Sequence, residues 1–388
     1  MTTTDFPFRE ALAQFMLWPG HVPVLRACLL DDQAGRDAWH ELTAGDRDLK
    51  GIFRDLPTPF KGLLPLLCAA ARRCGADLAD RDRTYLNTAY AREEHRIAAY
   101  SRISRTVLRR LEPVAGGPIV IDGSALAETL YAVPFERHSH DIHLLFADRE
   151  ALSAAVDGLR EDGLGAGVAA PGEETTTVRL PHPSGLSVVL SRRLFESAMH
   201  TLPAADLWGH AESRAVDGVA SRILSPSDTL LYLCGRLQSA GPAPNPLWIC
   251  DAWRLVRVRR DLDWSRLVDG ADAAALALPL ATLLCYLRDE LALDIPAAPV
   301  ERLVRLGRRQ REQDAYLASV RGSSGRAAFG LLRHFRRPAE GWAVLRHLLF
   351  PSAWMLQAVY GATTPAQRWR VYALRPLRFI AARLRPSG

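Results

Sequence analysis

Residues 119–164 read IVIDGSALAETLYAVPFERHSHDIHLLFADREALSAAVDGLREDGL, and this stretch determines the fold that we expect for the chain. The short apolar run at 118–121 lies between glycines, which is typical of a buried strand followed by a tight turn. The segment 124–131 has a helical pattern, and 140–146 reads as a second strand. A helix is expected to begin after Asp148 and to end at Gly163. The stretch therefore predicts a small unit of strands and helices.

The segments that follow extend the predicted sheet. Two β-branched runs, 175–182 and 185–191, are separated by Pro183-Ser184-Gly185, which is a hairpin signal. Residues 218–225 predict a last strand. We therefore expect a small mixed sheet between about 118 and 225, with helices on one side of it.

Helical patterns lie on both sides of this unit. An amphipathic stripe runs through 81–111. After the sheet, Ser225 is placed to cap a helix, with Pro226 in its first position and Asp228 three residues past the cap. The chain thus predicts an α+β fold in three parts: an N-terminal helical region at 1–115, an α/β core at 116–225, and a C-terminal helical region at 226–388 with a basic tail.

Composition and charge exclude several classes of protein. The chain has 388 residues, 48% of them apolar, which is enough for a packed core and too many for a disordered protein. The net charge of +6 hides a basic tail, because residues 301–388 hold seventeen arginines and four acids. We expect helices with solvated arginines there, and no stable nucleic-acid partner.

Further features concern the compartment. The six cysteines form no C-x-x-C pair and lie in apolar runs, as in a reducing compartment. We see no secretory signal at the start. The longest apolar run, 273–287, contains Pro279 and is shorter than the roughly 20 residues of a transmembrane helix. These features predict a cytoplasmic protein with no transmembrane segment.

The segment 138–143, HSHDIH, holds three of the eleven histidines and one acid. Taken alone, histidines at the start of a strand are most often solvated and without function. Strand geometry places Asp141 and His143 on the same face, however, because residues two apart point the same way. The segment is therefore a candidate metal or catalytic site.

The order of motifs resembles a bacterial family of uncharacterised nucleotidyltransferases, relatives of the polymerase-β-type superfamily. The resemblance covers about residues 60–380 and includes the later segments "ILSPSDTLLYLC" and "PLWICDAWRLV". The residues in register with the family pattern are Gly123, Ser124, Tyr131, Pro134, Arg137, Asp141, Leu144, Leu145 and Gly163.

This resemblance implies a nucleoside triphosphate substrate, an unknown acceptor and a divalent metal. Asp141 and His143 would be the catalytic metal ligands, and Gly123, Ser124 and Arg137 would bind the triphosphate. Asp122 would also lie in the substrate site and could supply a displaced carboxylate. The expected metal is Mg²⁺, or Mn²⁺ or Zn²⁺ because imidazole suits transition metals better than Mg²⁺. Such proteins often accompany biosynthesis genes, so a protein partner in a biosynthetic cluster is also expected.

The departures from the family pattern concern the metal ligands. His143 replaces the second carboxylate, Asp122 replaces a lysine, and Ser187 lies where a third acid is expected. Arg236 stands where relatives often carry a histidine. The metal motif is therefore degenerate.

Four readings of the site stay open at this point. The chain is a nucleotidyltransferase with an altered metal site, or a degenerate member of the fold that acts as a binding or scaffolding partner. A third reading is a transition-metal hydrolase that uses His138, His140 and His143. The fourth is an HD-type phosphohydrolase built on His140 and Asp141, which is disfavoured because those sites sit on helices.

Overall fold

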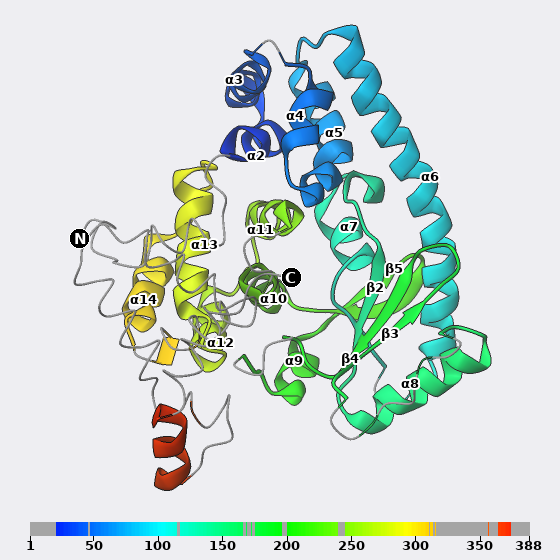
Figure 1. Ribbon diagram of the computed structural model, residues 1–388, viewed down its shortest axis with the longest axis vertical. Coiled ribbons are helices and arrows are strands. Elements are labelled where there is room, and N and C mark those ends of the chain that lie inside the picture. Colours follow the sequence, from blue (N-terminus) through cyan, green and yellow to red (C-terminus); the bar gives the residue numbers. More distant parts are fainter. Residues whose placement is uncertain are drawn as a thin grey trace.

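The computed structural model describes residues 21–45, 47–114, 117–165, 168, 172, 175–195, 200–239, 245–309, 311–312, 315, 356 and 364–373. Within these ranges the chain has a six-stranded mixed sheet with helical regions before and after it (Figure 1). The predicted α+β class is therefore confirmed.

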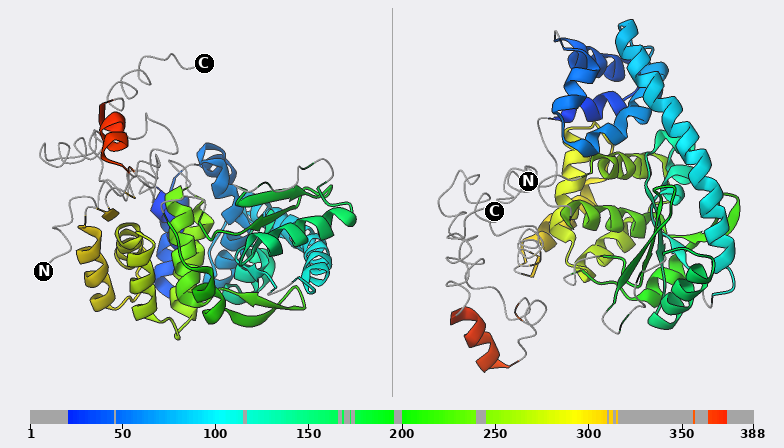
Figure 2. Two further views of the ribbon diagram at one scale, coloured as in Figure 1. Left: turned by 90° about the horizontal axis from the view of Figure 1, so that it is seen from below. Right: turned by 45° about the vertical axis from the view of Figure 1, so that its right-hand side comes forward.

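The N-terminal helices pack into a compact group beside one very long helix. They are α2 (Val22–Leu29), α3 (Asp32–Thr43), α4 (Leu49–Asp55), the 3-10 helix η3 (Thr58–Leu63), α5 (Leu64–Cys74) and α6 (Asp80–Leu111). Leu86 and Ala89 of α6 belong to the same core as α2 and α5, while Val107 and Leu108 belong to the core beneath the sheet. Helix α6 thus connects the two parts, and Figures 1 and 2 show it running along the outside of the sheet.

The sheet consists of strands from the predicted segments and one strand that the sequence pattern does not predict. They are β1 (Ile119–Val120), β2 (Asp141–Leu145), β3 (Thr177–Pro181), β4 (Ser187–Ser191), β5 (Glu212–Val216) and β6 (Val219–Ile223), in the spatial order β3-β4-β2-β1-β6-β5. Strand β2 is antiparallel to β1 and parallel to β4, and β1 is parallel to β6. The additional strand, β5, is largely exposed and polar, so it carries no clear apolar alternation.

Helices cover both faces of the sheet, so the expectation of helices on one side is wrong. On one face Leu144 packs with Leu152 of α8 (Arg149–Glu161) and with α6. On the other face Leu145 belongs to a core that includes Leu230 of α10 (Pro226–Ser239). Both faces need cover because β2 and β4 are apolar on successive residues, not only on alternate ones.

The remaining helices belong to the α/β part and to the second helical region. They are α7 (Ser124–Leu130), the 3-10 helix η4 (Pro134–Glu136) and α9 (Ala204–His210) within the α/β part, followed by α11 (Pro246–Val258), α12 (Trp264–Ala273), α13 (Ala277–Asp289) and α14 (Ala297–Gly307). None of the helices in the described ranges combines the length and the apolar character that crossing a bilayer requires.

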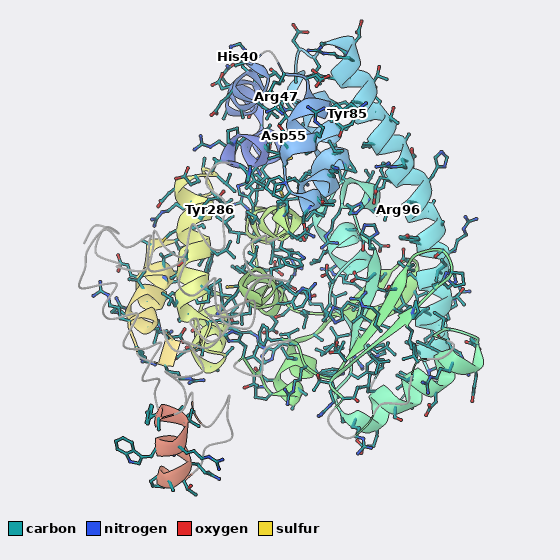
Figure 3. The ribbon with its side chains drawn as sticks, in the orientation of Figure 1. His40, Arg47, Asp55, Tyr85, Arg96 and Tyr286 are labelled. Carbon is teal, nitrogen blue, oxygen red and sulfur yellow. The ribbon has the colours of Figure 1, made fainter. Side chains whose placement is uncertain are left out.

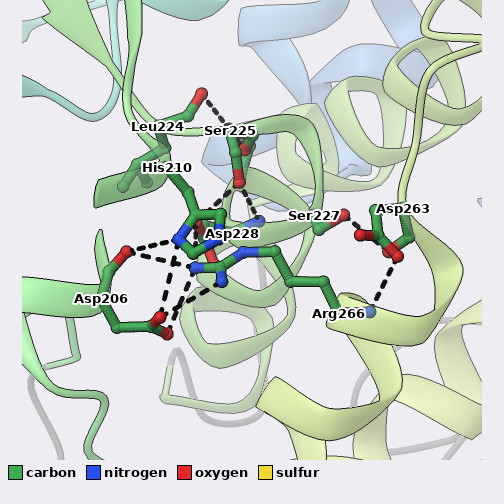
Figure 4. Close-up of polar contacts among 9 residues, drawn as sticks. Asp206, His210, Leu224, Ser225, Ser227, Asp228, Asp263 and Arg266 are labelled. Atoms are coloured by element: carbon green, nitrogen blue, oxygen red, sulfur yellow. Dashed lines mark hydrogen bonds and ion pairs between the residues drawn. The ribbon is translucent and has the colours of Figure 1, made fainter. Parts of the chain in front are cut away.

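A polar network fixes the start of α10 and confirms the predicted cap. The Asp228 backbone N–H donates to Ser225 Oγ at 3.2 Å, and this hydroxyl donates to the Asp228 carboxylate at 2.6 Å. Arg266 of α12 donates to the same carboxylate and also to Asp206 of α9 (Figure 4). Three helices are thereby tied to one point, which sets the position of α10 against the sheet.

Only part of the basic tail lies in the described residues. In α14, Val300, Leu303 and Leu306 are buried while Arg302 and Arg305 are exposed, in agreement with the expected solvated arginines. Arg302 pairs with Asp269 across an exposed 2.6 Å contact. Most of the predicted tail helices beyond this point lie outside the described residues.

Candidate functional site

The turn Gly123-Ser124 connects β1 to α7 and lies directly against the start of β2. Gly123 has a φ of +59°, in the left-handed region. A Cβ at this position would lie 2.6 Å from the carbonyl oxygen of Asp141 and 3.0 Å from Ser139 Oγ. Glycine is therefore required here for its conformation and for the close approach of the two chain segments.

Replacing Gly123 by alanine tests this requirement. Gly75, with φ +63° and no contact within 4 Å of the position that a Cβ would take, is the control, since it also has a positive φ, with a ψ of +40° against −114° at Gly123. We expect Gly75→Ala to lower the free energy of unfolding by about 1 kcal/mol, the usual cost of a left-handed non-glycine residue. Gly123→Ala should cost about 2 kcal/mol more because of the clash with Asp141. Equal losses in urea unfolding would show that the contact is unimportant.

Asp141 and His143 share a face of β2, as predicted, and this face looks toward α10. Asp141 is partly exposed, and Arg179 lies 3.9 Å from its carboxylate. Burial, with the charge of Asp122 second, raises the pKa of Asp141. In the parallel pairing of β2 and β4, Ser187 is the direct partner of Asp141. The position expected for a third acid therefore adjoins Asp141 and carries a hydroxyl.

His143 is buried, and both of its ring nitrogens are hydrogen-bonded. Tyr232 donates its hydroxyl proton to Asp122 at 3.0 Å, and its oxygen lies 3.3 Å from His143 Nδ1. The only arrangement that satisfies both contacts has the proton of the imidazole on Nδ1. Nε2 then accepts from Ser191 Oγ at 2.9 Å. Burial lowers the pKa of His143 to about 4, so the ring is neutral at pH 7.

This neutral histidine predicts a loss of stability in acid. Because the pKa of His143 is lower in the folded chain than in the unfolded chain, protons bind preferentially to the unfolded chain between pH 6.5 and about 4. The contribution of the neutral His143 to folding stability is complete above pH 6.5 and is lost as the pH falls toward 4. We expect the wild type to lose about 2–3 kcal/mol more than His143→Asn between pH 7.5 and 4.5. Urea unfolding at both pH values measures this difference, and parallel losses would contradict the assignment.

Asp122 and Arg137 belong to a buried ion cluster. Arg137 Nη2 donates to Asp122 at 2.6 Å, and Nε and Nη2 hold both carboxylate oxygens of Asp251 in α11 at 2.9 and 2.8 Å. Tyr131 also donates to Asp251, at 2.6 Å. Burial alone would raise the pKa of Asp122, but Arg137, Arg236 and the hydrogen bond from the Gly123 N–H together outweigh it and hold that pKa below its usual value.

These contacts decide whether the residues fit a divalent metal. Asp122 already accepts from Gly123 N, Arg137 and Tyr232, so its carboxylate is not a displaced metal ligand. His143 has both nitrogens engaged. Among the described residues no group of three or more His, Cys, Asp or Glu side chains could hold a metal ion. Asp141 alone does not make a Mg²⁺ site, so the donor set does not fit the metal that the resemblance implies.

The three histidines of 138–143 do not converge, which argues against the hydrolase reading. His138 and His140 contact each other, with their Nε2 atoms 2.6 Å apart, and His138 Nδ1 lies 3.0 Å from Glu93 of α6. Arg96, labelled on α6 in Figure 3, contacts His138 and Glu93. His143 lies instead in the buried network with Tyr232. The HD-type reading also fails, because Asp141 begins a strand.

Sequence reasoning misses several residues of the site. Asp251 and Tyr232 lie in apolar helical segments, "WICDAW" and "LLYLC", whose pattern indicates only a helical core. The one signal is Asp251 itself, since a single acid inside an apolar helix requires a buried partner. The resemblance suggests the triphosphate as the partner of Arg137, and the structure shows Arg137 paired with Asp122 and Asp251.

Comparison with known protein families assigns the chain to one of them. A mixed sheet with Gly-Ser at the start of a helix and an acidic strand beside it is the arrangement expected of a nucleotidyltransferase-type protein. The model of the family described as "Uncharacterised nucleotidyltransferase" matches residues 59–291, more than half of the chain, so the chain belongs to this family. No curated protein and no solved structure matches it.

Proposed function

We propose that this chain is a nucleotidyltransferase-fold protein that acts by binding a ligand and has lost metal-dependent nucleotidyl transfer. The family implies a nucleoside triphosphate substrate, and its chemistry needs carboxylates that hold a divalent metal against the triphosphate. The observation that carries the proposal is that the residues at the expected metal-ligand positions already bind other protein groups or lack a carboxylate. His143 is bonded at both nitrogens, Asp122 is paired with Arg137, and Ser187 stands beside Asp141.

Electrostatics around Asp141 support the same proposal. Arg179 lies beside its carboxylate. Burial and the charge of Asp122 raise the pKa of Asp141, and Arg236 and Arg179 offset only part of this rise. Cationic side chains next to a single carboxylate reduce the need for a metal ion and repel it. The protein would therefore use the inherited turn and sheet as a scaffold for recognition, with a protein partner or a small ligand as its target.

Labelled nucleotides test the proposal without knowledge of the acceptor. The wild-type chain and Asp141→Asn are incubated with α-labelled nucleoside triphosphates, cell extract and Mg²⁺, Mn²⁺ or Zn²⁺. We expect no labelled product that depends on the wild-type chain. Product formed by the wild type and lost in Asp141→Asn would overturn the proposal and establish an active transferase.

A further inference from the structure

A short helix at residues 365–373 lies apart from the other described helices. It is the red element of Figures 1 and 2. None of its nine residues is buried, whereas α14 buries Val300, Leu303 and Leu306. An isolated helix shorter than about 12 residues is marginal in water, because most helices of proteins are stabilised by the packing of an apolar face. Among the described residues, this helix has no such packed face.

The helix presents aromatic side chains to the solvent. Trp369 is 73% exposed, and the other large apolar side chain exposed in the described part of the chain is Val258. The rings of Trp369 and Tyr372 contact each other, with their centroids 6.1 Å apart. Residues three apart in a helix lie on the same side, so these two rings share one face. Tryptophan and tyrosine concentrate at membrane–water interfaces, because each has an apolar body and a polar tip.

Arginines flank this aromatic face. Successive residues of an α-helix are about 100° apart around its axis, so Arg368 and Arg370 lie on the two sides of Trp369. Arg370 is exposed. The long side chain of an arginine can cover apolar surface with its carbon atoms while its charge stays in a polar layer. An aromatic face with cations at its borders is the pattern of a helix that lies in a membrane interface.

The charge of this part of the sequence identifies the kind of surface. Residues 364–388 contain no acid and six arginines, which are Arg368, Arg370, Arg375, Arg378, Arg383 and Arg385. Each basic residue near an anionic bilayer raises the affinity roughly fivefold. Nucleic acids also attract arginines, but they offer no apolar interior for aliphatic side chains. Leucines and an isoleucine alternate with the arginines of this sequence, at 374, 377, 380 and 384, which favours a bilayer.

We propose that the helix at 365–373 binds the surface of an anionic phospholipid bilayer. Trp369 and Tyr372 would enter the headgroup layer, and Arg370 would pair with lipid phosphates. The bilayer would thereby supply the apolar contact that the helix lacks among the described residues. This inference goes beyond the proposed function, since the helix lies outside residues 59–291, the part of the chain that the family model matches.

Vesicle flotation of the full chain tests the proposal. One set of vesicles is pure phosphatidylcholine, and the other contains equal parts of phosphatidylcholine and phosphatidylserine. We expect binding to the anionic vesicles, much weaker binding to the neutral ones, and a loss of affinity as salt is added. Trp369→Ala should weaken binding roughly tenfold and Arg370→Gln roughly fivefold. The controls are Val258→Ala and Arg102→Gln, which remove an exposed apolar side chain and an exposed charge elsewhere and should have no effect.

Stability and a competing partner complete the test. Because Trp369 and Arg370 are exposed, both variants should keep the melting temperature of the wild type, so that weaker flotation reports lost contacts and not unfolding. The proposal is overturned if the chain does not float with anionic vesicles, if it floats equally with neutral ones, or if both variants bind like the wild type. Tighter binding to a DNA duplex of random sequence than to the anionic vesicles, at the same salt concentration, would also overturn it. Flotation uses no nucleotide, so its failure is distinct from any result on nucleotidyl transfer.

Discussion

Replacing Asp251 by alanine is expected to lower the free energy of unfolding by about 3–5 kcal/mol, the range for breaking a buried ion pair. Asp251 is fully buried and accepts hydrogen bonds from Arg137 and Tyr131. Its removal leaves the Arg137 charge with Asp122 as its one remaining carboxylate among the described residues, and leaves the Tyr131 hydroxyl without this acceptor. Urea unfolding of the full chain measures the change.

Asp269→Ala is the control for this substitution. Asp269 pairs with Arg302 at 2.6 Å, but both side chains are about half exposed or more. An exposed pair of this kind contributes about 0–1 kcal/mol, so the control should change stability very little. If Asp251→Ala lost no more stability than Asp269→Ala, the buried cluster would not be the structural centre that its contacts indicate.

Replacing His143 by aspartate is expected to have two opposite effects. The new carboxylate would lie near Asp122, without the imidazole contacts to Tyr232 and Ser191, and should lower stability by about 2–4 kcal/mol. It would also place a second hard oxygen ligand beside Asp141, on the same face of β2. Mg²⁺ with a nucleoside triphosphate should therefore raise the melting temperature of this variant while leaving the wild type unchanged.

His143→Asn separates charge from shape in this experiment. Asparagine has the size of aspartate but brings no charge, so the loss of stability should be smaller and Mg²⁺ should have no effect. A Mg²⁺-dependent shift in the asparagine variant would show that the metal binds elsewhere. No shift in the aspartate variant would show that the site cannot be restored by one ligand.

Much of the fold is predictable from the sequence because its signals are local. The Asp148 cap of α8, the Ser225 cap of α10 and the hairpin at 183–185 each depend on a few neighbouring residues. Which helices pack on each face of the sheet is not predictable in the same way. That α10 packs on the face of Leu145 depends on contacts between residues far apart in the chain, for which the sequence has no local signal.

The site is predictable in its position and not in its chemistry. Strand alternation places Asp141 and His143 on one face, and the glycine at 123 marks the turn. The hydrogen-bond partners of these groups come from distant parts of the chain: His143 contacts Tyr232, and Arg137 donates to Asp251. A buried arginine between two carboxylates and a triphosphate-binding arginine have the same sequence pattern, so only the three-dimensional contacts distinguish them.

The affinity of the wild-type chain for a non-hydrolysable nucleoside triphosphate, with and without Mg²⁺, tests the loss of the metal centre most directly. Calorimetry on the wild type and on Asp141→Asn measures this affinity without knowledge of the acceptor. We predict that Mg²⁺ gives no increase in affinity for either protein, since the described residues include no group of three or more His, Cys, Asp or Glu side chains that could hold a metal ion. An increase of roughly tenfold or more with Mg²⁺ in the wild type, abolished by Asp141→Asn, would contradict the account.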